Sequence, residues 1–241
     1  MTVVLDKTVR EVALENPSSI RVFEAFGIDY CCGGNRPLSE ACQRANLSVD
    51  EVLASLAKAD EADLARQQQR EWQSDPLSAL IAHIQGTHHK YTREEIARLL
   101  PLLEKVCSRH GKNHAELFDV LEVFRSLAQE LSAHMMKEEM ILFPYMARLQ
   151  AAAAKKEKLA SAPFGSVQNP VAMMEHEHDS AGDALRALRE KTNGYSAPAD
   201  ACVSYPTLYR ALAIFEADLH QHIHLENNIL FPRAVALEKG R

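Results

Sequence analysis

Two segments of the sequence repeat one pattern, a histidine followed four residues later by a glutamate. His134 and Glu138 precede the letters I-L-F-P, and 88 positions later His222 and Glu226 precede the same letters. Residues four apart share one face of a helix, so each imidazole and its carboxylate point the same way. A single pair of this kind is usually a surface contact, but apolar residues flank both pairs at helical spacing. The repeat predicts a cation held between helices, because a buried carboxylate is costly without a partner.

Further histidines could complete this set of donors. His178 lies on an apolar helical stripe, and an earlier segment offers two neighbours, His88 and His89. His89 precedes His134 by 45 residues, much as His178 precedes His222 by 44, and this match favours His89. His88 shares the face of the apolar residues upstream of it, so it stays open as the alternative ligand.

Three other histidines near these segments are interpreted as surface residues. The run His220, His222, His224 suggests a three-histidine site, but positions two apart in a helix point in nearly opposite directions. His220 and His224 share a face with the acidic residue Glu216, and His176 lies among polar neighbours. We expect His176, His220 and His224 to face solvent.

The candidate set therefore comprises four imidazoles and two carboxylates, with no thiolate. This composition disfavours cysteine-rich structural zinc, and the sequence has no H-E-x-x-H motif. Six nitrogen and oxygen donors from four helices suit two irons, or manganese, bridged by carboxylates. Two histidines and two bridging glutamates give each ion four bonds. About two octahedral positions per ion then remain for an oxo or hydroxo bridge and for a small ligand such as dioxygen or nitric oxide.

Adjacent cysteines form a second candidate site. Cys31 and Cys32 precede Gly33 and Gly34, which predicts a flexible, exposed turn. The pair could act as reactive thiols that exchange disulfides, accept iron or contact a client cluster. The alternative is two small residues in a tight loop. The other three cysteines are expected to pack as small hydrophobic residues: Cys42, Cys107 and Cys202.

The elements that position these residues are predicted to be helices throughout. Short helices with strong caps fill residues 1–60, a polar linker covers 61–75, and a larger domain covers 76–241. The larger domain is predicted to form a bundle of four amphipathic helices, at about 76–109, 114–150, 170–192 and 205–237. Pro144 and Pro232 fall inside this helical pattern, where kinks are expected. The fold class is all-α.

Composition excludes several classes of function. The net charge of −6 provides no basic field for nucleic acid, and no apolar run is long enough to span a membrane. Asp6 and Glu11 lie where a signal peptide would be apolar, and five cysteines are too few for a disulfide scaffold. These features favour the reducing cytoplasm. All 11 histidines fall between His83 and His224, so the imidazole chemistry belongs to the larger domain.

Together these motifs resemble the Repair of Iron Centers family of hemerythrin-like di-iron proteins. The resemblance rests on the strings from His134 to Pro144, Met174 to Asp183 and His222 to Pro232, and on Asp29-Tyr30-Cys31-Cys32-Gly33-Gly34. It covers nearly the whole chain. It implies two irons, with Glu138 and Glu226 as bridges and with these terminal ligands: His89, His134, His178 and His222.

The function follows from the resemblance alone, since composition and spacing predict only the metal site. The family is implicated in restoring iron–sulfur clusters damaged by oxidative or nitrosative stress, through donation of iron to damaged iron–sulfur proteins. Reduction of nitric oxide at the di-iron site is the alternative, which would make the chain an enzyme. A third interpretation is a sensor that binds oxygen or nitric oxide. The sequence leaves a homodimer open.

Overall fold

The structure is a computed structural model that describes residues 6–16, 18–64, 72–157 and 162–240. The predicted all-α fold is confirmed, because the described residues form helices, with isolated bridges at Thr8–Pro37 and Ala162–Gly165 as their only β pairing. The described residues divide into two compact units, one formed by the residues up to Asp75 together with Ile223–Ile229, and the other by Pro76–His222 and the residues from Leu230 onward. None of the helices in the described ranges is long and apolar enough to cross a membrane.

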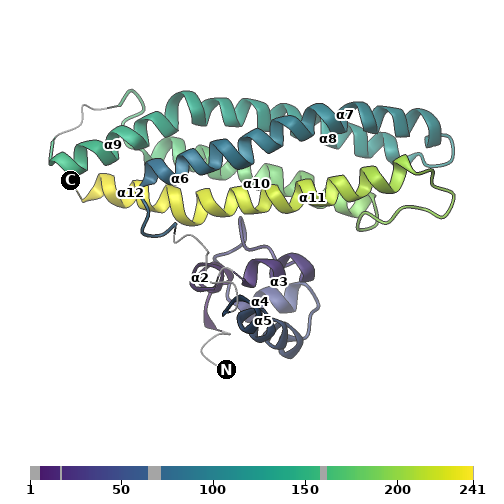
Figure 1. Cartoon of the computed structure of the whole chain (residues 1–241), viewed down its shortest axis with the longest axis horizontal. Helices are drawn as coiled ribbons and strands as arrows, with labels where there is room; N and C mark the ends of the chain where they lie inside the picture. Colours follow the sequence, from purple (N-terminus) through teal and green to yellow (C-terminus); the bar gives the residue numbers. More distant parts are fainter. Residues whose placement is uncertain (1–5, 17, 65–71, 158–161, 241) are drawn as a thin grey trace. The chain divides into compact units, whose positions relative to one another are not determined.

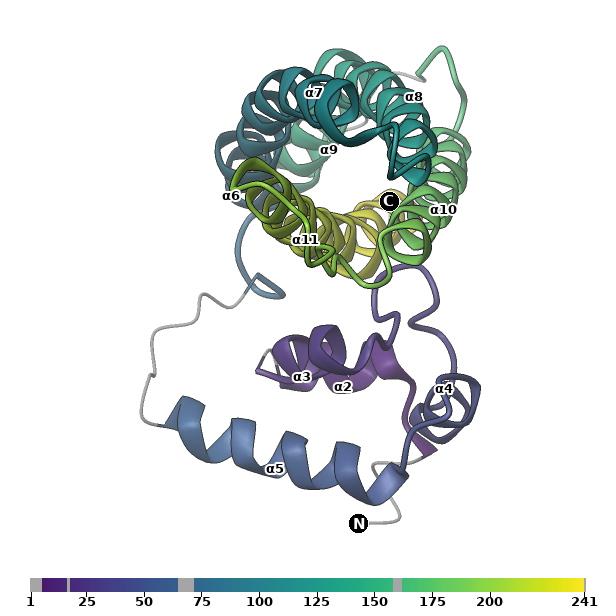
Figure 2. The same ribbon diagram turned by 90° about the vertical axis from the view of Figure 1, so that its right-hand side faces the viewer.

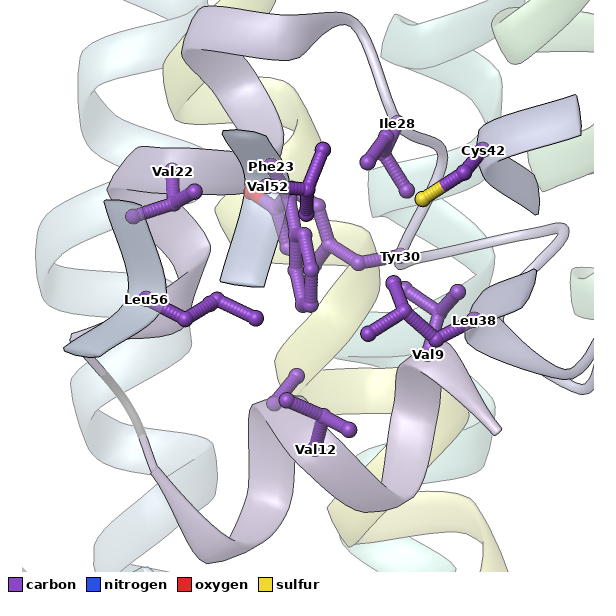
Figure 3. Packing of buried hydrophobic residues seen from close by; sticks show 11 residues of the cluster. Val9, Val12, Val22, Phe23, Ile28, Tyr30, Leu38, Cys42, Val52 and Leu56 are labelled. Atoms are coloured by element: carbon purple, nitrogen blue, oxygen red, sulfur yellow. The ribbon is translucent and has the colours of Figure 1, made fainter. Parts of the chain in front are cut away.

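The N-terminal unit is a cluster of short helices whose ends are set by local signals. Thr8 and Glu11 form a capping box at the first helix, and Gly27 ends the second with a left-handed φ of 66°. A hydrophobic core that includes Phe23 and Tyr30 holds the helices together (Figure 3). The helices of the unit are α2 (Val9–Glu15), α3 (Ser19–Phe26), α4 (Leu38–Arg44) and α5 (Val49–Leu64).

The larger unit is a bundle of long helical rods, seen from the side in Figure 1 and end-on in Figure 2. Residues 111–115 join the first rod to the second and residues 192–203 join the third to the fourth, and the rods joined in this way run antiparallel. Buried apolar side chains fill the interior, for example Phe124 against Phe215, whose ring centroids are 5.5 Å apart. In chain order the segments are α6 (Leu77–His83), η1 (Ile84–His89) and α7 (Lys90–His110); α8 (Glu116–Lys137), η2 (Glu138–Leu142) and α9 (Phe143–Lys155); α10 (Gln168–Lys191); and α11 (Ser204–Leu225), η3 (Glu226–Leu230) and α12 (Phe231–Lys239).

Three of these rods contain a short π-helical segment, and each segment carries a predicted metal ligand. The segment η1 ends at His89, η2 begins at Glu138 and η3 begins at Glu226. Pro144 and Pro232 lie in the first turn of the α-helices that follow η2 and η3. Because proline has no backbone N–H, each of these residues removes one α-helical hydrogen bond next to the wider π-helical turn. Such π turns are frequent at functional sites.

Some predicted boundaries need correction. The first four residues of the predicted linker, 61–64, belong to α5. This helix continues for about one turn after its apolar stripe ends. Residues 65–71 of that linker lie outside the described residues. The second rod begins at Glu116 and runs to Lys155, five residues beyond the predicted end. An alanine-rich run, 151–154, sustains it, since alanine has the highest helix propensity.

Candidate metal centre

Six buried side chains converge inside the bundle, and they are the six that the sequence singled out. Four donor atoms come together in one group, from His89, Glu138, His222 and Glu226. A second group takes its donors from His134 and His178 and from the same two glutamates. Within each group the donor atoms lie within 4.8 Å of one another. The two groups therefore share both carboxylates and differ in their histidines.

The inner distances show how the two groups meet. Nε2 of His89 is 3.1 Å from Nε2 of His222. The same 3.1 Å separates the Nε2 atoms of His134 and His178. Oε2 of Glu138 lies between the groups, 3.3 Å from Nε2 of His89 and 3.2 Å from Nε2 of His134. A single carboxylate oxygen thus faces histidines of both groups, as a bridging ligand would.

The donor set fits a pair of cations. Two imidazole nitrogens that face each other at 3.1 Å match one edge of an octahedron with metal–nitrogen bonds of about 2.1 Å, which is about 3.0 Å. Glu138 and Glu226 are both fully buried. Two ionised carboxylates close together at this depth are costly without positive charge, and cations among them supply it. The set has no sulfur and combines imidazole with carboxylate, which suits iron or manganese.

The outward nitrogens of two of these histidines are held by carboxylates. Nδ1 of His89 lies 2.7 Å from Oε1 of Glu139, and Arg93 lies 2.8 Å from the other oxygen of that carboxylate. Although partial burial opposes it, hydrogen bonds from His89 and Arg93 lower the pKa of Glu139. An ionised Glu139 accepts a hydrogen bond from the Nδ1–H of His89, which leaves the Nε2 lone pair of His89 directed inward.

His134 has the same arrangement in the other group. Its Nδ1 lies 2.9 Å from Oε2 of Glu177, whose second oxygen pairs with Lys137. Hydrogen bonds from Lys137 and His134 lower the pKa of Glu177 against the effect of its partial burial. Neither Glu139 nor Glu177 is among the residues predicted from the sequence. Each is the sequence neighbour of a proposed ligand, but its partner histidine lies on another rod, and no spacing rule within one helix reveals that contact.

The structure separates the two candidates on the first rod. His89 joins the donor groups, whereas His88 is buried beside them with Nδ1 3.0 Å from Oδ1 of Asp218. The ring of His88 stacks on that of His222 with an interplanar angle of 7°. His88 thus packs against a proposed ligand without directing a nitrogen into either group.

Among the three histidines expected to face solvent, His224 needs correction and His220 is only partly exposed. His224 is buried, with Nδ1 2.9 Å from Nδ2 of Asn228, and burial lowers its pKa to about 4. Glu216, on the face assigned to solvent, is also buried and receives a bidentate contact from Arg189 of α10. Helical periodicity failed here because the long α11 is covered on more than one face. His176 is exposed, as expected.

The cysteines also differ from expectation. Cys31 is buried rather than exposed, and Cys32 is partly buried beside it. A hydrogen bond to Cys32 and burial raise the pKa of Cys31 well above its usual range, so it is a protonated thiol at neutral pH. Cys42 and Cys107 are buried, as expected, but Cys202 is exposed. Its sulfur lies 3.0 Å from Nε2 of His110, and this contact lowers the pKa of Cys202 to about 7.

Comparison with known proteins identifies the class that this fold and site define. Residues 80–234 match the hemerythrin HHE cation binding domain, and residues 5–60 match a domain of unknown function named ScdA_N. The chain is 36% identical over 233 residues to the iron-sulfur cluster repair protein YtfE of Escherichia coli O81 (strain ED1a). It shows the same identity to the protein of that name from Escherichia fergusonii. Both alignments cover 97% of this chain and 98% of the relative. The chain belongs to this family of hemerythrin-like proteins with an N-terminal ScdA_N domain.

Proposed function

We propose that this protein binds two irons and repairs iron–sulfur clusters damaged by oxidative or nitrosative stress by donating iron to them. The observation that supports the proposal most strongly is the pair of four-donor groups that share Glu138 and Glu226. The related proteins named for iron–sulfur cluster repair match nearly the full length of the chain, both units included. Damaged iron–sulfur proteins are therefore the proposed partners.

The protein's own residues define what such a centre could do. One ion would be bound by His89 and His222, and the other by His134 and His178. Glu138 and Glu226 belong to both donor groups and would be shared by the two ions. When bound, the iron pair supplies redox chemistry and open coordination positions for dioxygen or nitric oxide. Four protein donors for each ion fall short of an octahedral set, which favours exchange and release over permanent retention. Five free thiols support the reducing cytoplasm as the proposed compartment.

Metal analysis and Mössbauer spectroscopy on protein from iron-replete cells test the centre. We expect two irons per chain in wild type and in Glu104→Gln, a control that removes an exposed bundle carboxylate. The double variant Glu138→Gln with Glu226→Gln should lose most of the iron while keeping its helical circular dichroism. A double variant that retains both irons would overturn the proposed bridging role.

Transfer of iron tests the function. Protein loaded with ⁵⁷Fe is mixed with an enzyme whose [4Fe–4S] cluster has been damaged by nitric oxide. Enzyme activity should return together with ⁵⁷Fe in the rebuilt cluster, and the Glu138→Gln, Glu226→Gln variant should restore neither. If the loaded protein restores no activity and produces nitrous oxide over many turnovers with a reductant, nitric oxide reduction replaces repair as the function.

A further inference from the structure

A second cluster of metal-ligating side chains lies in the N-terminal unit, outside the bundle. Its members are Asp29, Cys31 and Cys32, and one donor atom from each lies within 4.8 Å of the other two. The sulfur atoms of Cys31 and Cys32 are 3.8 Å apart and are not bonded to each other. Oδ1 of Asp29 is 3.5 Å from the sulfur of Cys31. Two thiols and a carboxylate thus face a common point.

Backbone hydrogen bonds hold the carboxylate in this position. Oδ1 of Asp29 accepts the backbone N–H of Cys31 at 3.1 Å and that of Cys32 at 3.0 Å. Tyr30, which lies between Asp29 and Cys31 in the chain, points into the hydrophobic cluster (Figure 3). Its hydroxyl donates to Glu24 at 2.8 Å. Tyr30 is fully buried, so it anchors the segment in the hydrophobic core. The three donors therefore belong to a fixed loop.

The loop is also fixed from its other end. The backbone N–H groups of Val9 and Arg10, in the first turn of α2, donate to the carbonyl oxygens of Arg36 and Gly34. A Cβ at Gly34 would lie only 2.6 Å from the carbonyl oxygen of Tyr30, so the chain folds back at a distance that only glycine permits. This close return keeps both cysteines near Asp29.

The observed spacings match those around a tetrahedral metal ion. Bonds of about 2.3 Å to sulfur and about 2.0 Å to oxygen place two sulfurs about 3.8 Å apart, and a sulfur and an oxygen about 3.5 Å apart. These values agree with the separations of the two sulfurs and of Asp29 from Cys31. We propose that Asp29, Cys31 and Cys32 bind one thiophilic divalent cation, of the class of Zn²⁺ and Fe²⁺, with a fourth position left for an external ligand.

This site differs in chemistry from the bundle centre and does not depend on the proposed repair function. Its two sulfurs select softer cations, whereas the bundle offers only nitrogen and oxygen donors. Binding exchanges the two thiol protons for one cation, and both protons pass to the buffer. Cys32 is only partly buried, so the fourth ligand can approach the ion from that side.

A titration with Co²⁺ under anaerobic conditions tests the site in the full-length protein already loaded with iron. Thiolate-bound cobalt has a sulfur-to-metal charge-transfer band in the near ultraviolet, which a nitrogen and oxygen site lacks. We expect this band to saturate at one Co²⁺ per chain, with visible absorption of tetrahedral strength and release of two protons. No charge-transfer band at any Co²⁺ concentration would overturn the proposal.

Single substitutions assign the ligands. Cys31→Ser and Cys32→Ser should each abolish or strongly shift the band, and Cys202→Ser, which removes an exposed thiol elsewhere, should leave it unchanged. Asp29→Asn keeps an oxygen for the two backbone N–H groups but removes the charge, so cobalt affinity should fall at least tenfold. Because Cys31 is buried, circular dichroism is used to check that the Cys31→Ser variant folds. The result for Cys32→Ser does not depend on that check. An unchanged band in Cys32→Ser, or unchanged affinity in Asp29→Asn, would contradict the assignment.

Discussion

Glu139 and Glu177 lie on different rods of the bundle, yet each holds the outward nitrogen of one histidine and is itself paired with one cation. Glu139 contacts His89 and Arg93, while Glu177 contacts His134 and Lys137. His89 and His134 belong to different donor groups, so each group has one histidine oriented in this way. In both donor groups, a carboxylate paired with a Lys or Arg side chain therefore orients one buried histidine.

Loss of either carboxylate should weaken iron binding without removing a ligand. Glu139→Ala and Glu177→Ala free the imidazole ring to rotate and to change tautomer, so we expect iron affinity to fall about 10- to 100-fold. Competition with a chromophoric iron chelator measures this loss. Glu104→Ala is the matched control, since its carboxylate pairs with Arg125 on the surface and contacts no histidine in the described structure. Equal affinity in Glu139→Ala and Glu104→Ala would refute the orienting role.

The two neighbouring histidines of the first rod should respond differently to substitution. His89→Gln removes a nitrogen from a donor group and should reduce the iron content to one per chain or less. His88→Gln can still donate a hydrogen bond to Asp218, so this variant should keep both irons. Iron content and the ligand-field spectrum measure both effects. Loss of iron from His88→Gln with retention in His89→Gln would exchange their roles.

Removal of iron should destabilise the bundle, and the glutamates should be the cause. Without iron, Glu138 and Glu226 are two fully buried carboxylates that lie close together, which costs free energy of folding. The metal-free double variant Glu138→Gln, Glu226→Gln should therefore melt about 4 °C or more above metal-free wild type. Iron-loaded wild type should be the most stable of the three, because a ligand that binds only the folded state stabilises it. Thermal unfolding followed by circular dichroism gives the order, and a lower Tm for the metal-free variant would contradict it.

Cys202 should react with electrophiles at a lower pH than an ordinary thiol. Because its contact with His110 favours the thiolate, alkylation by iodoacetamide should reach half of its maximal rate near pH 7. Below this pH the thiol is protonated and the rate should fall. His110→Asn should move the midpoint upward, toward the value of about 8.5 for a free cysteine. Peptide mass mapping measures the alkylation of Cys202, with buried Cys42 as the internal control. An unchanged midpoint in His110→Asn would rule out the pairing of Cys202 with His110.

Much of the candidate centre could be predicted because its residues follow one-dimensional rules. The spacing of four between His134 and Glu138 places both side chains on one helix face, and its recurrence 88 residues later marks a second such helix. Apolar neighbours at the same period indicated that these faces point inward. The matched spacings favoured His89 over His88 but left His88 open, because His88 shares the face of the apolar residues upstream of it.

The sequence by itself determined the helical class of the fold and the types of donor in the bundle, since both depend on periodicity and residue chemistry within single segments. Only the tertiary structure decided which carboxylates hold the histidines and why Glu216 and His224 are buried. The physical reason is that burial and contact between segments depend on how rods and loops pack together. The contact between His89 and Glu139 spans 50 residues, and no helical period reaches that far.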